Sequence, residues 1–183
     1  TGIEQRRIAT TESSLDMAAA AAEQALQGID KDSIGLVIVA TITPDNITPS
    51  MAAMVKKELG LERAIAFDIN AACAGFLFGY NTAQAYIAAG MAKTVLVIGS
   101  ESLSNLVNWK DRSTCILFGD GAGAAVVSAD EDGNIDGRGN IEIPSVLHSD
   151  GSRGEVLTCQ NPTGKRADGS LKGYVAMDGR EIY

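Results

Sequence analysis

Residues 64–92 read AIAFDINAACAGFLFGYNTAQAYIAAGMA. The segment AIAFDI (64–69) has the short apolar composition of a buried strand, and CAGFLFGYNTAQAYIAAG (73–90) has the length of a helix. Because the strand ends close to where the helix begins, Cys73 is predicted to stand at the helix N-terminus. A strand, a sharp turn and a helix in this order indicate an α/β protein.

The same alternation of strand and helix extends along the chain on both sides. Ser13 and Asp16 form a capping-box-like helix start, and an Ala-rich run follows to Leu26. IGLVIVAT (34–41) and TVLVIGS (94–100) are β-branched runs typical of strands covered on both faces. Thr48-Pro49 predicts the start of a second helix, with Pro at the first helical position, and Gly60 follows its end. A largely parallel sheet is therefore expected.

The character of the sequence changes after a loop that contains Trp109. CILFGDGAGAAVVSA (115–129) predicts a strand, Asp132-Gly133-Asn134 predicts a hairpin turn, and the polar run 151–173 predicts a surface loop. GDGAGA (119–124) matches neither common phosphate-binding glycine motif, so its glycines are interpreted as positions of close backbone packing.

One predicted helix carries an unusual composition. Residues 69–92 contain no Asp, Glu, Lys or Arg, although a helix on the outside of an α/β domain normally shows a polar stripe. Asn, Thr, Gln and Gly residues interrupt its apolar character, which argues against a membrane span. We expect this helix to be buried on most of its sides, sandwiched between layers, which demands a second sheet, more protein than these residues supply, or a partner subunit.

The composition excludes several classes of function. The chain has 183 residues and a formal net charge of -8, which argues against a nucleic-acid surface. Three irregularly spaced cysteines suggest neither a disulfide framework nor a zinc site, and a reducing cytoplasm fits them best. The first residues have no secretory signal pattern, and the absence of an initial Met suggests a chain cut at both ends.

Cys73 is the best candidate for chemistry. The thiolate is the nucleophilic form of cysteine, and a helix N-terminus favours it while offering backbone N–H groups to an oxyanion. The open alternative is that Cys73 is only a small buried hydrophobic residue. Cys115 is interpreted as a core residue, Cys159 as a loop residue without a predicted partner, and His148, the only histidine, as a structural residue rather than the base for Cys73.

Four motifs in order carry a family resemblance. NAACAGF (70–76), DRSTCILFGDGAGAAV (111–126), HSDGSRGE (148–155) and TGIEQRR (1–7) together closely resemble β-ketoacyl-acyl-carrier-protein synthase III, a condensing enzyme of the thiolase superfamily. The resemblance implies the thiolase-like α/β fold, as the N-terminal half of its duplicated α-β-α-β-α architecture without the first strand. It also implies an acyltransferase that condenses a short acyl group from acyl-CoA with malonyl-acyl-carrier-protein and so initiates type II fatty-acid synthesis.

The resemblance also assigns roles to individual residues. It makes Cys73 the acylated nucleophile, and it places Arg112 and Ser113 at the coenzyme A entrance. Leu103 and Phe118 match positions around the acyl pocket. Thr48 falls where several relatives have an aromatic residue that reaches the partner subunit's pocket. No metal and no cofactor are implied, because acyl-CoA and malonyl-acyl-carrier-protein are substrates.

Other expectations concern what lies outside these residues. The family pairs its cysteine with a His and an Asn in the second half of the chain, so residues 1–183 are expected to be a partial domain that is inactive alone. A cytoplasmic homodimer is implied, and acyl carrier protein would dock on a basic patch to which Arg6, Arg7, Lys110 and Arg112 could contribute. The alternatives are another cysteine-dependent condensing enzyme of the superfamily, or a catalytically silent scaffold.

Overall fold

The computed structural model describes residues 2–129, 146–161 and 173–182. The chain folds as two compact units, and each is described by itself. The first, called the sheet unit, comprises Thr10–Glu101 and Gly121–Leu147. The second, called the small unit, comprises Thr1–Ala9, Ser102–Asp120 and His148–Tyr183.

A four-stranded sheet forms the centre of the sheet unit. Its strands are β1 (Ile34–Ala40), β2 (Ile65–Ile69), β3 (Thr94–Ser102) and β4 (Asp120–Ser128), in the order β2-β1-β3-β4. Strands β2 and β3 both pair with β1 in parallel. Strand β4 runs antiparallel to β3, because Ser104, just after β3, binds the start of β4, and Ala129, just after β4, binds Lys93 before β3. The predicted largely parallel sheet is confirmed.

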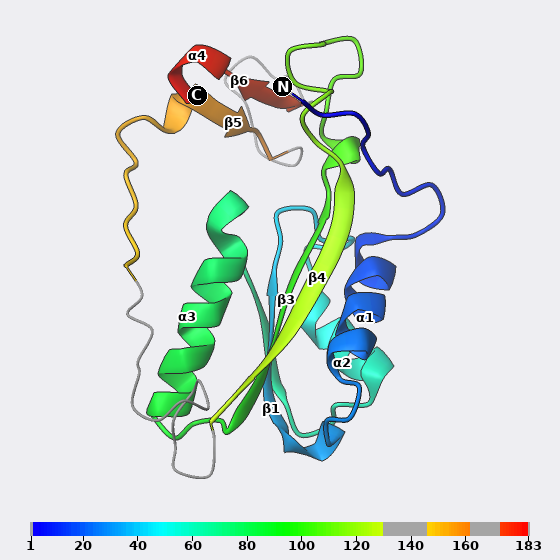
Figure 1. The fold of residues 1–183 in the computed structure, drawn as a ribbon, viewed down its shortest axis with the longest axis vertical. Helices are drawn as coiled ribbons and strands as arrows, with labels where there is room; N and C mark the ends of the chain where they lie inside the picture. The colour runs from blue at the N-terminus through cyan, green and yellow to red at the C-terminus, as the bar shows by residue number, and fades with distance from the viewer. Residues whose placement is uncertain (1, 130–145, 162–172, 183) are drawn as a thin grey trace. The chain divides into compact units, whose positions relative to one another are not determined.

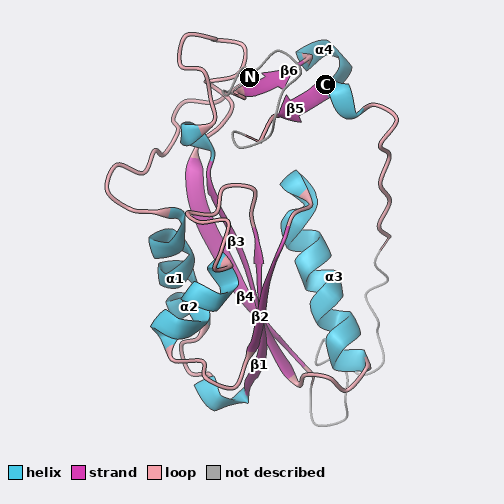
Figure 2. Cartoon of the chain, turned by 180° about the vertical axis from the view of Figure 1, so that it is seen from behind, coloured by secondary structure: helices cyan, strands magenta, loops and turns pink. Residues whose placement is uncertain are grey.

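Helices cover both faces of this sheet. Helices α1 (Ser14–Ala25) and α2 (Met51–Leu59) lie on one face, and α3 (Gly75–Ala88) lies on the other (Figure 1). The same three-layer arrangement is seen from behind in Figure 2. Because side chains alternate along a strand, β1 and β3 contribute to a hydrophobic core on each face of the sheet. The core toward α1 and α2 contains Val37, Val39, Leu96 and Ile98. The core toward α3 contains Leu36, Ile38, Val95 and Val97.

Local sequence signals explain where α1 and α2 begin and end. The predicted capping box of α1 is present, because the Ser13 hydroxyl accepts from the Asp16 N–H and the Asp16 carboxylate accepts from the Ser13 N–H. Gly60 ends α2 in the left-handed conformation, with a φ of 68°. The predicted start of α2 was wrong: Ser50 is its N-cap, so Pro49 lies outside the helix rather than at its first position. The Ser50 hydroxyl, which accepts from Ala53 N–H, provides the cap that Pro49 cannot.

The uncharged helix α3 is covered by the described residues on one side only. Its buried stripe is formed by Gly75, Gly79, Ala83 and Ile87. Elsewhere on the helix, Phe76 is 38% exposed and Leu77 is 62% exposed. The sheet contacts the helix along this single stripe, so burial of the other sides by further protein or a partner subunit stays a prediction.

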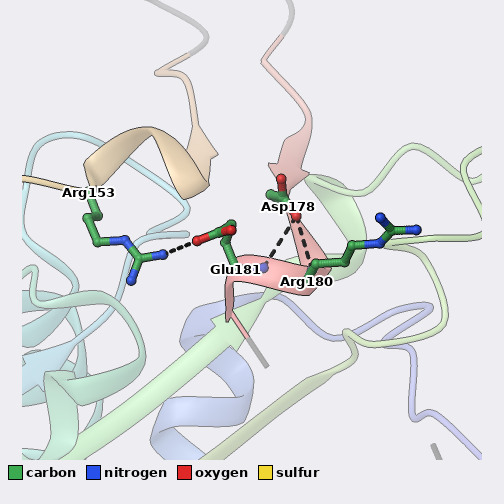
Figure 3. Close-up of polar contacts among 4 residues, drawn as sticks. All are labelled: Arg153, Asp178, Arg180 and Glu181. Atoms are coloured by element: carbon green, nitrogen blue, oxygen red, sulfur yellow. Dashed lines mark hydrogen bonds and ion pairs between the residues drawn. The ribbon is translucent and has the colours of Figure 1, made fainter.

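The small unit contains a two-stranded antiparallel sheet of β5 (Leu157–Cys159) and β6 (Val175–Met177), followed by α4 (Gly179–Ile182). Part of the predicted surface loop 151–173 is thus a strand. In Figure 3, Asp178 accepts from the backbone N–H groups of Arg180 and Glu181, and Arg153 forms an ion pair with Glu181. Both partners of this ion pair are more than half exposed, so it contributes little to stability.

The prediction of close backbone packing at the glycines of residues 119–124 is confirmed at Gly119 only. A Cβ on Gly119 would lie 2.8 Å from the Arg7 carbonyl oxygen, which confirms close packing there, but a Cβ on Gly121 or Gly123 would meet nothing within 4 Å. These last two glycines are therefore not packing positions, and they lie within β4. The hairpin predicted at residues 132–134 lies outside the described residues. No described helix is long and apolar enough to cross a membrane.

Candidate functional site

Cys73 stands at a sharp elbow between β2 and α3. A short 3₁₀ turn, Ala72–Ala74, leads directly into α3, and Cys73 is exposed at its centre. Ala72 has a φ of 46°, the left-handed conformation that disfavours residues with a Cβ, at a cost of about 1–2 kcal/mol. This strained residue turns the chain so that the next side chain projects from the surface. The interpretation of Cys73 as a small buried hydrophobic residue was wrong.

The backbone around Cys73 leaves the start of α3 without a capping side chain among the described residues. Within the 3₁₀ turn, the Asn70 side chain accepts from the Ala72 N–H at 3.4 Å, and the Ala74 and Gly75 N–H groups donate to backbone carbonyls. Because the N–H groups at a helix start carry partial positive charge, they favour a negative oxygen beside the thiol. The neighbouring Ala72, Ala74 and Gly75 leave space for an acyl group on the sulfur. These features are those expected of a nucleophilic cysteine.

Glycines bring α3 close to the sheet and so fix the position of the elbow. A Cβ on Gly75 would lie 3.0 Å from the Ala40 Cβ on β1, and one on Gly79 would lie 3.0 Å from a Val97 methyl group. At Gly75 the opposing atom is attached directly to the backbone and cannot rotate away. Only glycine allows this approach without a shift of the helix.

Replacing Gly75 with alanine is expected to lower the free energy of unfolding by about 1–2 kcal/mol. Overpacking costs about 1–3 kcal/mol, and the better helix propensity of alanine offsets part of it. Urea denaturation measures the change. Gly121→Ala is the matched control, because its Cβ would meet nothing within 4 Å. Equal stability of the two variants would contradict the packing role of Gly75.

Asp68, near the end of β2, connects the elbow to α2. Its carboxylate oxygens accept from the N–H groups of Met51 and Ala52, each at 2.7 Å. The strand that leads to Cys73 is thereby attached to the first turn of α2. Sequence reasoning missed this residue, although a lone carboxylate within the apolar AIAFDI was the available signal.

Thr48 lies in the same unit as Cys73, in the connection between β1 and α2. It is exposed, and a cis peptide bond joins it to Pro49. The neighbouring Ile47 is 80% exposed. The structure therefore presents Thr48 at the surface of the sheet unit.

The other predicted site residues belong to the small unit. Leu103, in the 3₁₀ turn Leu103–Asn105, and Phe118 are half-buried, whereas Arg112 and Ser113 are exposed. The Ser113 hydroxyl donates to Asp111 at 2.6 Å, and this bond, the Ser113 N–H and the Thr114 hydroxyl lower the pKa of Asp111. Asp111 thus fixes the turn from which Arg112 projects.

Asp120 organises the small unit around these residues. One of its oxygens accepts from the Ser104 N–H at 2.8 Å, and the other accepts from the Ser104 hydroxyl and the Ala9 N–H. Its own N–H donates to the Arg7 carbonyl at 2.8 Å. This carboxylate therefore holds the N-terminal segment against the turn that carries Leu103.

The other two cysteines and the histidine are weaker candidates for a chemical role than Cys73. Cys115 and Cys159 are half-buried, and burial raises the pKa of the Cys159 thiol, which lies 3.8 Å from the Gly173 carbonyl oxygen. His148 is exposed and belongs to the small unit, whereas Cys73 belongs to the sheet unit. Among the described residues, no cluster of three His, Cys, Asp or Glu side chains could hold a metal ion.

Comparisons with known proteins place the chain beside one group of enzymes. A family model described as 3-oxoacyl-[acyl-carrier-protein] synthase III matches residues 67–151, which include the elbow and the start of β4. β-Ketoacyl-[acyl-carrier-protein] synthase III of Clostridium perfringens is 44% identical over 190 residues, which cover all of this chain and 56% of that protein. The chain is homologous to β-ketoacyl-[acyl-carrier-protein] synthase III over about half of that protein's length.

Solved structures of synthase III show the same fold. The crystal structure from Aquifex aeolicus matches with a TM-score of 0.83 and 41% identity, covering all of this chain and 55% of that one. The structure from Pseudomonas aeruginosa matches with a TM-score of 0.85 and 36% identity, covering 54% of its chain. The thiolase-like α/β fold and the likeness to a synthase III condensing enzyme of fatty-acid synthesis are therefore confirmed.

Proposed function

We propose that the protein containing this chain is an acyltransferase of the synthase III type, with Cys73 as its acylated nucleophile. The Cys73 thiolate attacks the carbonyl carbon of an acyl-CoA, a tetrahedral intermediate forms, and the bond to the coenzyme A sulfur breaks. The acyl group remains on Cys73 as a thioester, and coenzyme A leaves as a thiolate, which takes up a proton from solvent to become the free thiol. The exposed sulfur at the elbow is the observation that carries this proposal.

The second step of the proposed reaction is a condensation. Malonyl-acyl-carrier-protein loses carbon dioxide, and the carbanion that forms attacks the acyl carbonyl on Cys73. The new carbon–carbon bond replaces the thioester bond, and the Cys73 thiolate is released. The resemblance assigns stabilisation of this carbanion to a His and an Asn beyond the matched half, so we propose that residues 1–183 form a partial domain that needs the remainder for turnover.

The charge distribution supports the proposed substrates. Arg6, Arg7, Lys110 and Arg112 are all exposed, and all belong to the small unit. Exposed cations in a chain of net charge -8 are suited to coenzyme A phosphates or to an acidic carrier protein. Arg112 with Ser113 is the proposed coenzyme A contact, and Leu103, Phe118 and Thr48 are the proposed acyl-pocket residues.

The proposed assembly is a cytoplasmic homodimer. The exposed, uncharged sides of α3 favour cover by the remainder of the protein, because apolar side chains such as Leu77 gain from leaving water. The three cysteines are free thiols in this structure, as suits a reducing compartment.

Intact mass spectrometry of the protein before and after brief incubation with acetyl-CoA tests the proposal. We expect the addition of one acetyl group, and digestion should locate it on the peptide that contains Cys73. An acetyl group on Cys115 or Cys159 would contradict the assignment. If no acetyl group is taken up by the full-length protein, the silent scaffold is favoured instead.

A further inference from the structure

Three carboxylates hold the connection between β1 and α2, here called the 41–50 loop. Glu101 binds the first residues of the loop. Asp45, in its middle, accepts from the N–H groups of Ser14 and Leu15 at 3.2 and 2.8 Å, which attaches it to the first turn of α1. Asp68 binds the first turn of α2, where the loop ends. The loop is thus fixed at its beginning, middle and end, although residues 45–49 are exposed.

Glu101 makes a dense set of contacts with the start of the loop. One carboxyl oxygen accepts from the Ile42 N–H at 2.9 Å, and the other accepts from the Thr43 hydroxyl at 2.6 Å. The Thr41 hydroxyl lies 3.5 Å from the second oxygen and accepts from the Thr43 N–H at 3.0 Å. One side chain on β3 therefore determines the path of three consecutive loop residues.

The strand register places Glu101 on the same face of the sheet as the elbow. Gly99 pairs with Ala40, and a Cβ on Gly99 would lie 3.6 Å from the Phe76 ring on the first turn of α3. Ser100 points to the opposite face, where its hydroxyl donates to the Ser14 carbonyl at 2.8 Å. Because side chains alternate along a strand, Glu101 lies on the α3 face at the carboxyl end of β3. Ligands of parallel α/β sheets bind at this end of the strands.

We propose that Glu101 is a positioning residue for the acyl site, because it sets the path of residues 41–43, which directly follow Ala40, and Ala40 packs against Gly75 beside the elbow. This inference rests on the proposed function for its link to acyl transfer. The claim that Glu101 holds the loop does not depend on that function. The consequence is that the range of acyl groups accepted depends on a residue that does not touch the acyl chain.

Glu101→Ala tests the proposal through two separate measurements. Hydrogen exchange of the full protein should show that amide protection at Ile42 falls about tenfold or more, because the carboxylate oxygen that accepts from this N–H is removed. The rate of acylation by isobutyryl-CoA relative to acetyl-CoA should rise by about tenfold, because a released loop leaves more room. Glu62→Ala, which removes a carboxylate from the exposed turn before β2, is the matched control. It should change neither the amide protection nor the ratio of the two acylation rates.

Glu101→Gln separates positioning from a general loss of stability. The Gln carbonyl oxygen can accept from the Ile42 N–H, and its amide can donate to the Thr43 hydroxyl oxygen, so protection and acyl preference should stay within about twofold of the parent protein. Thr43→Val, which removes one donor while keeping the side-chain shape, should shift both quantities in the same direction as Glu101→Ala but by less. These variants keep the test decisive even if Glu101→Ala does not fold.

The pH dependence supplies a further readout. Burial raises the pKa of Glu101, against the lowering effect of the Thr43 hydroxyl and the Ile42 and Thr41 donors. The donors that face it are uncharged, and the loop's other two carboxylates, Asp45 and Asp68, bind α1 and α2 instead. An opened loop would return Glu101 to water and to its ordinary pKa, so closing the loop favours proton binding. Loop protection should therefore fall as pH rises through the raised pKa, and Glu101→Gln should remove this dependence.

The outcomes separate the inference from the proposed function. Unchanged loop protection in Glu101→Ala would overturn the positioning role, whatever the acyl transfer results. Reduced protection with an unchanged acyl preference would also overturn it, because the loop would then not act on the acyl site. If no acyl group is taken up by any variant but protection still falls, the proposed function fails while the structural role of Glu101 stands.

Discussion

Replacing Cys73 with serine is expected to abolish the acyl-enzyme and to lower turnover of acetyl-CoA with malonyl-acyl-carrier-protein by at least about 10³-fold. A hydroxyl is a much weaker nucleophile than a thiolate, and removal of a catalytic nucleophile commonly costs three to six orders of magnitude. Release of the coenzyme A thiol by the full-length protein gives the rate. The acyl-enzyme is measured by intact mass.

The exposure of Cys73 makes this experiment easy to interpret. Because the side chain is exposed, the serine variant should unfold at the same temperature as the parent protein. Cys115→Ser and Cys159→Ser are matched controls, since both residues are half-buried and belong to the small unit. Full turnover in Cys73→Ser, or loss of the acyl group in either control, would rule out Cys73 as the nucleophile.

The sequence predicted those parts of the fold that depend on local signals. Ser13 and Asp16 fix the start of α1 through contacts three residues apart, and Gly60 ends α2 because glycine adopts a positive φ without strain. The start of α2 was misplaced by two residues, because Thr48-Pro49 and Ser50 are competing local signals. Nothing local indicated that the described residues cover only one stripe of α3.

The candidate site was also predictable only in part, because local signals do not specify contacts between residues far apart in the sequence. The position of Cys73 in the turn between β2 and α3 was predicted correctly, but the left-handed Ala72 was not, because alanine has no local preference for that conformation. Glu101 and Asp68 act on residues 58 and 17 positions away, as their contacts with Thr43 and Met51 show. Such pairs follow from the sheet order and register, which the spacing of apolar residues does not specify.

Asp68 is expected to have the largest effect on stability among the site carboxylates. Asp68→Ala removes two short hydrogen bonds to an ionised acceptor and a negative charge at the N-terminus of α2. Bonds of this kind contribute about 1.5–3 kcal/mol each, so we expect the free energy of unfolding to fall by about 3–5 kcal/mol. Urea denaturation measures the change, which is a large part of the about 5–15 kcal/mol that stabilises a typical domain.

Asp68→Ala should also slow the acylation of Cys73, through the position of the elbow rather than through contact with the sulfur. Asp68 lies five residues before Cys73, and without it the carboxyl end of β2 is no longer attached to α2, so the elbow loses one of its supports. Asp68→Asn keeps the shape and one acceptor oxygen, and it should lose about half as much stability as Asp68→Ala. Asp32→Ala, an exposed carboxylate on the 3₁₀ turn before β1, is the control and should stay within about 0.5 kcal/mol of the parent protein. If Asp68→Ala were as stable as this control, the carboxylate would not be what holds α2 to the strand leading to Cys73.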